Sequence, residues 1–226
     1  MIKKHIPNFI TCLNLFSGSI AVYYAFQGNY TAVLWLVLLA AVFDFLDGFA
    51  ARILNAYSPM GKEMDSLADV ISFGLAPGAV AFSLLRESTL PEWVAFAGFI
   101  IPVFSALRLA KFNIDERQSS SFIGLPTPAN ALFWVGLGYS FPDFLIANNW
   151  LVFIFIVVFS GLLVAEIPMF SLKFKNMDWK KNQLQYIFLI VCILLLGIFQ
   201  FDAFAPIIVW YIFLSIVTSF FKISTK

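Results

Sequence analysis

The sequence predicts an all-α fold, a polytopic membrane helical bundle of about eight transmembrane helices. Of the 226 residues, 61% are hydrophobic and only 12% are charged, whereas soluble domains carry about 25% charged residues. This composition excludes a disordered chain and a small disulfide-bonded scaffold. The net charge is only +1, so the chain lacks the excess of basic residues that binding to a nucleic acid would require.

Hydrophobic windows define the expected helices. A helix needs roughly 20 apolar residues to cross the hydrocarbon core. Eight windows of about that length, bounded by charges, proline or polar clusters, occur at residues 8–26, 31–49, 67–85, 93–109, 129–144, 150–167, 184–199 and 203–221. Pro142 and Asp143 shorten the fifth window. Since no repeat, linker or change of composition divides the chain, we expect one integral-membrane domain over residues 1–226.

Charges and polar residues mark the ends of these windows in order. The first window follows Lys3 and Lys4 without a clear small-residue cleavage site, so we expect an uncleaved span rather than a signal peptide. The second window ends in the run AVFDFLDGFAAR, and the third opens in GKEMDSLADV. The fourth ends at LRLAKFN, and the fifth follows FIGLPTPAN. The last three windows are almost purely apolar.

The distribution of Lys and Arg predicts the orientation. With eight spans, 13 of the 14 cations fall on one side and only Arg86 falls on the other. The thirteen are Lys3, Lys4, Arg52, Lys62, Arg108, Lys111, Arg117, Lys173, Lys175, Lys180, Lys181, Lys222 and Lys226. Because short cytoplasmic loops carry the excess of positive charge, we expect both termini to be cytoplasmic, in a multi-pass protein of the cell membrane.

Four acids have no ordinary loop position. Asp44 and Asp47 close the second window, and Asp65 and Asp69 open the third. Spacings of three and four residues place each pair on one helix face, so two antiparallel neighbours can bring four carboxylates together. Ionisable residues at membrane depth are costly and are functional candidates for that reason.

Four like charges at close quarters need compensation, and two divalent cations would balance them. No His or Cys lies nearby in the sequence, so the ligands are all oxygen, which suits Mg²⁺ or Mn²⁺. Two metals about 3.5–4 Å apart recur in enzymes that displace groups at phosphorus. The pattern therefore indicates phosphoryl transfer with the active site facing the cytoplasm.

Other interpretations stay open at this point. The acids can be interfacial charges paired with Arg52 or Lys62, or they can line the path of a small cation transporter. A transporter predicts acids near the bilayer midplane and helices broken there, whereas these acids lie at helix ends on one side.

Gly48 and Ala51 also leave a groove on the second helix, with Arg52 at its edge to reach a phosphate.

The spacing Asp44-x2-Asp47-Gly48-x2-Ala51-Arg52-x8-Gly61-x3-Asp65-x3-Asp69 resembles the signature of the CDP-alcohol phosphatidyltransferase family at all eight positions. The resemblance implies a membrane enzyme that transfers a phosphatidyl or related group from a CDP-linked donor to an alcohol and releases CMP. It implies that the four aspartates bind metal and that Asp69 is also the base for the alcohol. It implies a nucleotide pocket lined by the Gly, Ala and Arg positions: Gly48, Ala51, Arg52 and Gly61.

Flanking stretches resemble one branch of that family, the phosphatidylserine synthases. These are Pro7-Asn8-x2-Thr11-x2-Asn14-x2-Ser17-Gly18, the run ISFGLAPG, and the pair LRLAKFN and FIGLPTPAN. This resemblance covers roughly residues 1–140 and implies CDP-diacylglycerol and L-serine as substrates and a homodimer in the bilayer. Phosphatidylglycerophosphate and phosphatidylinositol-phosphate synthases, with the same reaction and another alcohol, remain the alternative.

A serine acceptor is zwitterionic, so its site needs a fixed cation for the carboxylate and acceptors for the ammonium. Arg108 and Lys111, one turn apart, and the following Asn113 are the candidates, although both cations also suit positive-inside anchoring. Gly124 and Pro126 predict a rigid loop before the fifth window. Asn8 can bind the donor phosphates from the first helix, or it can make a polar contact between helices.

Overall fold

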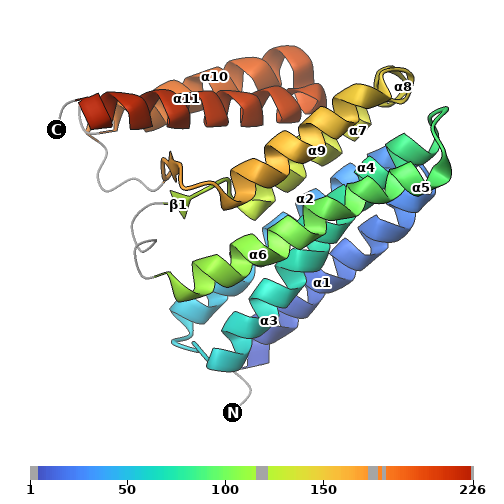
Figure 1. Cartoon of the computed structure of the whole chain (residues 1–226). Coiled ribbons are helices and arrows are strands. Elements are labelled where there is room, and N and C mark those ends of the chain that lie inside the picture. Colours follow the sequence, from blue (N-terminus) through green and yellow to red (C-terminus); the bar gives the residue numbers. More distant parts are fainter. Residues whose placement is uncertain (1–4, 116–121, 173–177, 180–181, 225–226) are drawn as a thin grey trace.

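The structure is a computed structural model that describes residues 5–115, 122–172, 178–179 and 182–224, and these residues are almost entirely helical (Figure 1). The first half contains α1 (His5–Phe26), α2 (Tyr30–Ile53), α3 (Pro59–Asp69), the π-helical turn η2 (Val70–Leu75), α4 (Ala76–Arg86), α5 (Glu92–Ala95), the 3₁₀ turn η3 (Phe96–Phe99) and α6 (Ile100–Ile114).

The second half contains β1 (Phe122–Ile123), α7 (Thr127–Ser140), α8 (Pro142–Ala147), α9 (Asn149–Val164), β2 (Pro168–Met169), α10 (Gln183–Phe199), the 3₁₀ turn η6 (Gln200–Ala203) and α11 (Phe204–Ser224). The two strands pair antiparallel, with Phe122 opposite Met169. A helix therefore lies at each of the eight predicted windows.

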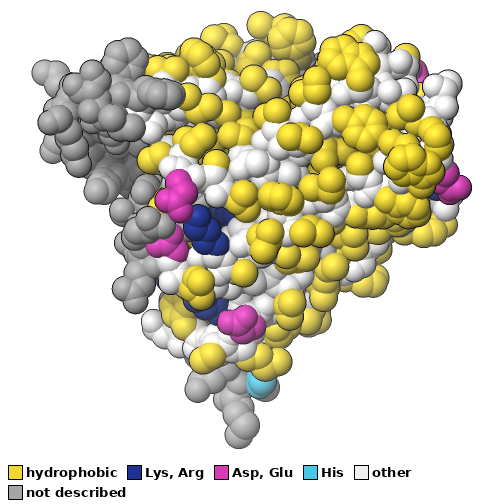
Figure 2. Space-filling model, viewed as in Figure 1, with side chains coloured by type: hydrophobic (Ala, Val, Ile, Leu, Met, Phe, Trp, Pro, Cys, Tyr) yellow, Lys and Arg dark blue, Asp and Glu magenta, His cyan; other side chains and the backbone are white. Residues whose placement is uncertain are grey.

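Length and composition identify the membrane-crossing stretches. Five are long and apolar enough to span: His5–Phe26, Tyr30–Ile53, Pro59–Arg86, Glu92–Ile114 and Gln183–Ser219. Asn149–Val164 is a shorter apolar helix, and α7 has only 14 residues because the chain turns before Pro142. The face drawn in Figure 2 is mainly hydrophobic, and its charged side chains gather towards the two ends. The prediction of an all-α, multi-pass membrane bundle is confirmed.

The helical hairpin of α1 and α2 forms one side of the site. Gly28 adopts a φ of +69° in the turn, a conformation that glycine reaches without steric cost. The side chain of Asn29 then caps α2 by accepting a hydrogen bond from the Ala32 amide. The two helices pack along their length, so polar residues near the start of α1 lie beside the end of α2.

The connection from α2 to α3 is a tight helix-terminating turn. Asn55 has a φ of +48°, and the amides of Asn55 and Ala56 donate to the carbonyls of Arg52 and Ala51. This is the Schellman pattern. Ser58 then caps α3 through the Gly61 amide, with Pro59 at the first helical position. The turn folds α3 back along α2, so that the acids in the second half of α2 lie beside Asp65 of α3.

A π-helical turn interrupts the rod from Pro59 to Arg86. Pro77 has no amide hydrogen and its ring would clash with the carbonyl four residues earlier, and the chain upstream adopts i to i+5 bonding, as from Ala76 to Ile71. π turns inside α-helices are frequent at functional sites, and this one begins directly after Asp69. Gly18 of α1 lies against it, since a Cβ at Gly18 would approach the Ser72 Cα to 2.6 Å.

The remaining helices cover the other side of this rod. Phe133 of α7 stacks on Phe159 of α9 at 3.7 Å between ring centroids. Gly136 of α7 allows Phe204 of α11 to approach closely, because a Cβ there would be 2.8 Å from the Phe204 Cβ. In Figure 1, α10 and α11 lie side by side beyond α7 and α9.

The described cations agree with the predicted division into two ends. Arg52 ends α2, Lys62 begins α3, and Lys111 lies in the last turn of α6. Arg86 lies at the opposite end, where it donates to the carbonyl of Phe26 at 2.9 Å. Eight of the thirteen cations lie outside the described residues: Lys3, Lys4, Arg117, Lys173, Lys175, Lys180, Lys181 and Lys226.

Candidate active site and metal centre

Three of the four predicted aspartates converge. Asp44, Asp47 and Asp65 each offer a carboxylate oxygen, and these oxygens all lie within 4.8 Å of one another. The first two come from the end of α2 and the third from α3. The helical spacing read from the sequence therefore brings the pairs together across two helices. We call these three residues the carboxylate triad.

Helix α1 contributes to the triad through Thr11. Its hydroxyl donates a hydrogen bond of 2.6 Å to Oδ2 of Asp47, and both side chains are buried. This contact leaves the other oxygen of Asp47 for a further ligand and fixes the orientation of the carboxylate. In the sequence, Thr11 belongs only to the stretch from Pro7 to Gly18 that resembles the family, and that pattern does not predict this role.

Asp69 lies beside the triad, buried at the end of α3. It lies close enough to all three triad members for their charges to interact with its own. The side-chain amide of Asn14 donates to its Oδ1 at 3.4 Å. Asn14 is in turn linked to the π-helical turn, because the Ser72 hydroxyl donates to its carbonyl at 3.0 Å.

The four carboxylates fit a hard divalent cation. The ligand atoms are all oxygen, the set that such ions prefer. Among the described residues, no Lys or Arg forms an ion pair with any of these aspartates, so pairing with Arg52 or Lys62 does not account for them. A cluster of acids without cationic partners is the arrangement that a bound cation would stabilise.

A cavity of about 520 Å³ opens beside the triad and is bounded by α1, α2 and α3. Asp47 and Asp65 lie in its wall. Four of the five residues predicted to bind the nucleotide or the phosphates of the donor also line it: Asn8, Gly48, Ala51 and Gly61. A Cβ at Gly48 would meet no atom within 4 Å, whereas one at Gly61 would come within 2.9 Å of Asn8 Oδ1. Arg52 is exposed and is not among the lining residues.

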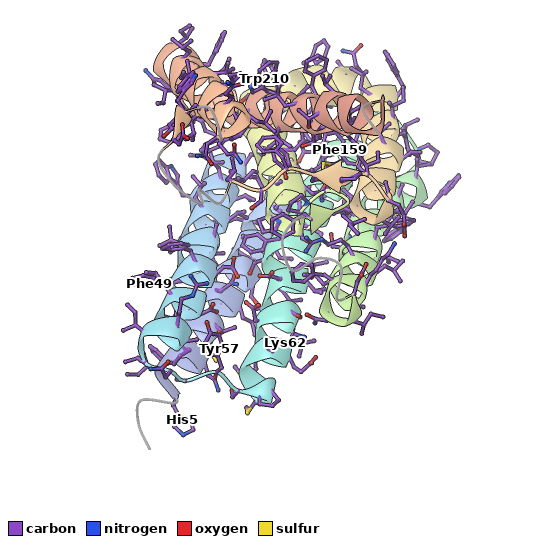
Figure 3. The ribbon with its side chains drawn as sticks, turned by 90° about the vertical axis from the view of Figure 1, so that its left-hand side faces the viewer. His5, Phe49, Tyr57, Lys62, Phe159 and Trp210 are labelled. Carbon is purple, nitrogen blue, oxygen red and sulfur yellow. The ribbon has the colours of Figure 1, made fainter. Side chains whose placement is uncertain are left out.

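Several lining residues were not identified from the sequence. They are Pro7, Ala56, Tyr57, Ser58, Pro59 and Lys62. Figure 3 shows Tyr57 and Lys62 near the end of α2 and the start of α3, whereas Phe49 points outward from α2. The signal that would have found most of them is the helix stop at Asn55 followed by Ser58-Pro59, a pattern for a short turn between two helices.

The predicted acceptor residue Arg108 is buried. Its guanidinium lies 4.9 Å from the ring centre of Phe112 and 5.8 Å from that of Phe122, and only 6% of the residue is exposed. It interacts electrostatically with Asp69 and with Tyr211 of α11. Positive-inside anchoring alone does not explain a buried guanidinium, because an anchoring cation reaches the aqueous headgroup layer.

Lys111 and Asn113 make contacts between elements. Nζ of Lys111 forms an ion pair of 2.8 Å with Glu166, which follows α9. The side-chain amide of Asn113 donates to the Ser66 hydroxyl at 2.8 Å, and its carbonyl accepts a hydrogen bond from Lys62. Asn113 therefore joins the end of α6 to α3, near the aspartates.

Gly124 and Pro126 form the fixed turn that the sequence predicted. Gly124 has a φ of +77°, and a Cβ there would lie 2.5 Å from the carbonyl oxygen of Leu163. Its amide donates to Ile167 at 2.9 Å, and the amide of Leu125 donates to Leu162 at 2.8 Å. Pro126 then precedes the first residue of α7.

Comparison with known proteins places this site in a family. The family model described as CDP-alcohol phosphatidyltransferase matches residues 4–221. This chain belongs to that family. The match also corrects the sequence analysis, which confined the resemblance to residues 1–140 and assigned the last two helices only apolar bulk. Tyr211, on the last helix, is buried and donates a hydrogen bond of 3.0 Å to the carbonyl of Phe170.

Individual members of the family are similar over most of this chain. It is 36% identical over 174 residues to the CDP-diacylglycerol--serine O-phosphatidyltransferase of Mycobacterium leprae, covering 73% of this chain and 57% of that protein. It is 34% identical over 197 residues to the enzyme of the same name from Helicobacter pylori, covering 85% and 81%. It is 36% identical over 144 residues to the enzyme of the same name from Bacillus subtilis, covering 64% of this chain and 81% of that protein. The chain thus spans little more than half of the mycobacterial relative.

Proposed function

We propose that this protein transfers the phosphatidyl group from CDP-diacylglycerol to the hydroxyl of L-serine, releasing CMP and forming phosphatidylserine. The observation that carries the proposal is the group of four aspartates beside a cavity lined by the signature residues Gly48, Ala51 and Gly61. The names of the relatives support serine as the acceptor.

The proposed cofactor is Mg²⁺ or Mn²⁺, two ions per active site, held by Asp44, Asp47, Asp65 and Asp69. When bound, such ions neutralise the charge on a diphosphate and on its leaving group. Thr11 orients Asp47 for this purpose, and Asn14 orients Asp69.

The cytidine nucleotide of the donor occupies the cavity beside the triad. Gly48 presents no side chain there, so the donor approaches the backbone of α2 closely. Asn8 offers an amide to the phosphates from α1, and Arg52 reaches them from the exposed edge. The acyl chains stay in the bilayer, because the outer faces of the helices carry exposed apolar side chains such as Phe16, Phe45 and Val42.

The reaction is a direct displacement. The serine hydroxyl oxygen attacks the phosphorus that carries diacylglycerol, the bond from that phosphorus to the CMP oxygen breaks, and CMP leaves with the bonding electrons. Asp69 accepts the proton of the hydroxyl. A covalent intermediate would need a nucleophilic Ser, Cys or His beside a base. Among the described residues that line the cavity, Ser58 is the only one of these types, and its hydroxyl oxygen caps α3 by accepting a hydrogen bond from the Gly61 amide.

The acceptor binds on the side of Asp69 that faces α6. Arg108, whose guanidinium is buried near the end of α6, binds the serine carboxylate, and the serine hydroxyl lies near Asp69. Lys111 and Asn113 hold the end of α6 against Glu166 and Ser66. Gly124 and Pro126 fix the turn that covers this side.

We further propose that the protein lies in the cell membrane with both termini and the active site on the cytoplasmic side, as a homodimer. The positions of Arg52, Lys62 and Lys111 at one end of the bundle and of Arg86 at the other support this orientation. The exposed apolar side chains leave surface for a second copy as well as for lipid.

One assay tests the function. The purified protein is incubated with CDP-diacylglycerol, Mg²⁺ or Mn²⁺, and a panel of labelled alcohols: serine, glycerol 3-phosphate and inositol phosphate. We expect labelled lipid and CMP with serine alone. A lipid product from another acceptor, with none from serine, would refute the proposed substrate while leaving the family reaction intact.

A further inference from the structure

Buried polar side chains without hydrogen-bond partners occur near the end of α6 and at the start of α7. They are Nε and Nη2 of Arg108, the hydroxyl of Thr127, and both polar atoms of the Asn130 amide. Thr127 and Asn130 are 0% exposed. None of these atoms finds a partner among the described residues. Because buried polar groups are nearly always hydrogen-bonded, such a concentration indicates a place where a polar ligand binds.

The helix contacts place these side chains at the level of Asp69. A Cβ at Gly74 would lie 3.0 Å from the Ser105 Cβ. Since α6 runs antiparallel to the rod of α3, η2 and α4, Arg108 lies one turn from Ser105 in the direction of Asp69. The electrostatic interaction between Arg108 and Asp69 agrees with this placement.

Helix α7 reaches the same level from another side. A Cβ at Gly138 would lie 2.7 Å from Val80 and 3.4 Å from Tyr30. Helices α4 and α7 both run towards the α1–α2 turn, so positions eight residues earlier on each also lie near one another. Asn130 is therefore about level with Ser72, and Thr127 with Asp69. The contact between α7 and η2 agrees with this register.

We propose that Thr127 and Asn130 are specificity-determining residues that bind the ammonium group of the amino-acid acceptor while Arg108 binds its carboxylate. This inference rests on the proposed function. An ammonium group has three donors and no acceptor, and the Thr127 hydroxyl and the Asn130 carbonyl oxygen are both acceptors. Neutral acceptors suit this position, because they bind the ammonium without adding a further negative charge next to four carboxylates.

The arrangement also separates the three groups of the acceptor. Arg108 on α6 takes the carboxylate, the start of α7 takes the ammonium, and Asp69 on α3 faces the hydroxyl. Each of the three helices therefore binds one group of the acceptor. An alcohol without an ammonium group would leave the acceptors of Thr127 and Asn130 unpaired, which disfavours it by the desolvation of those groups.

The test uses Thr127→Val, which is nearly isosteric, and Asn130→Leu, with Thr127→Ser as the conservative variant. The matched control is Ser83→Ala, because Ser83 is also 0% exposed with an unpaired hydroxyl but lies farther along α4. The readouts are the KM for serine, the KM for CDP-diacylglycerol, and the inhibition constants of L-alanine and propionate. These two inhibitors share a carboxylate, and only alanine has an ammonium group.

We expect Thr127→Val and Asn130→Leu to raise the serine KM and the alanine inhibition constant by about 10-fold or more, since a hydrogen bond to a charged group is lost. The propionate constant and the KM for CDP-diacylglycerol stay unchanged, as do all values for Ser83→Ala, and Thr127→Ser, which keeps the hydroxyl, retains the preference for alanine over propionate. Equal changes for alanine and propionate, or none for either, would overturn the inference. A variant that no longer binds CDP in a calorimetric titration is misfolded. If Asn130→Leu does not fold, the comparison of Thr127→Val with Thr127→Ser tests the inference.

The two proposals fail in different ways. If the unsubstituted protein makes no lipid from serine but accepts another alcohol, the proposed function is wrong. If it makes phosphatidylserine and the variants keep the preference for alanine over propionate, only the assignment of Thr127 and Asn130 is wrong.

Discussion

Thr11 of α1 donates a 2.6 Å hydrogen bond to Asp47 of α2, across 36 positions of sequence. The contact joins the first helix to the carboxylate triad and holds one oxygen of Asp47 in place. A group that orients an acidic ligand in this way affects the affinity for a bound cation, although it does not contact the cation itself.

Thr11→Val should therefore lower the affinity for Mn²⁺ by about 10–100-fold, because the valine keeps the shape of the side chain and removes the donor. Isothermal titration with Mn²⁺ on the purified protein measures the effect. Thr11→Ser retains the hydroxyl and serves as the control. Equal Mn²⁺ affinity in Thr11→Val and the unsubstituted protein would show that the hydrogen bond does not orient a ligand.

Asp44→Asn and Asp65→Asn should each abolish turnover through loss of the cation, since each substitution removes one negative charge from the triad. Phosphatidylserine formation and Mn²⁺ binding are measured together. Turnover that survives either substitution would argue against the proposed metal ligands.

Asp69→Asn should abolish turnover through loss of the base as well as of one metal ligand, because an amide cannot accept the hydroxyl proton. CDP should still bind, since the cavity is lined by Asp47 and Asp65 rather than by Asp69. A calorimetric titration with CDP alongside the activity assay separates the two effects. A variant that retains full activity would exclude Asp69 as the base.

Chelation of divalent cations should remove activity, and added Mg²⁺ or Mn²⁺ should restore it. The physical reason is that the four carboxylates have no ion-pairing Lys or Arg among the described residues, so the diphosphate of the donor would otherwise meet uncompensated negative charge. The measurement is the rate of CMP release before and after dialysis against a chelator. Undiminished release without divalent cations would contradict the metal site.

Gly18→Ala should destabilise the protein by about 1–3 kcal/mol, the usual effect of extra volume in a packed interior. The new Cβ would come within 2.6 Å of the Ser72 Cα and would push α1 away from the π-helical turn. Gly161→Ala is the matched control, because a Cβ there meets nothing within 4 Å. Thermal unfolding in detergent compares the two, and similar midpoints would show that the close approach at Gly18 is not needed.

The helical architecture was largely predictable because its signals are local. Apolar windows of sufficient length, ended by charges or by proline, fall within α1, α2 and the rod of Pro59–Arg86, and these helices extend beyond the windows by up to eight residues. The π-helical turn after Asp69 and the left-handed Asn55 were not predicted. Both depend on how a helix packs against its neighbours, and hydrophobic periodicity does not predict that packing.

The site was predictable where its residues share one helix face. The spacing of Asp44 with Asp47, and of Asp65 with Asp69, requires only helical geometry. Thr127 and Asn130 could not be recognised in the same way, because a Thr and an Asn at the start of a helix are ordinary residues there. Their burial without partners emerges only when α7 packs against η2.

The sequence by itself determined the class of protein, the helices and the four aspartates, since composition, window length and residue spacing depend only on neighbours along the chain. The tertiary structure decided which groups meet across it. It placed Thr11 on Asp47, Asn14 on Asp69, and the buried Arg108 guanidinium beside the rings of Phe112 and Phe122. Hydrogen bonds and buried charges join residues far apart in sequence, so their partners are set by packing rather than by spacing.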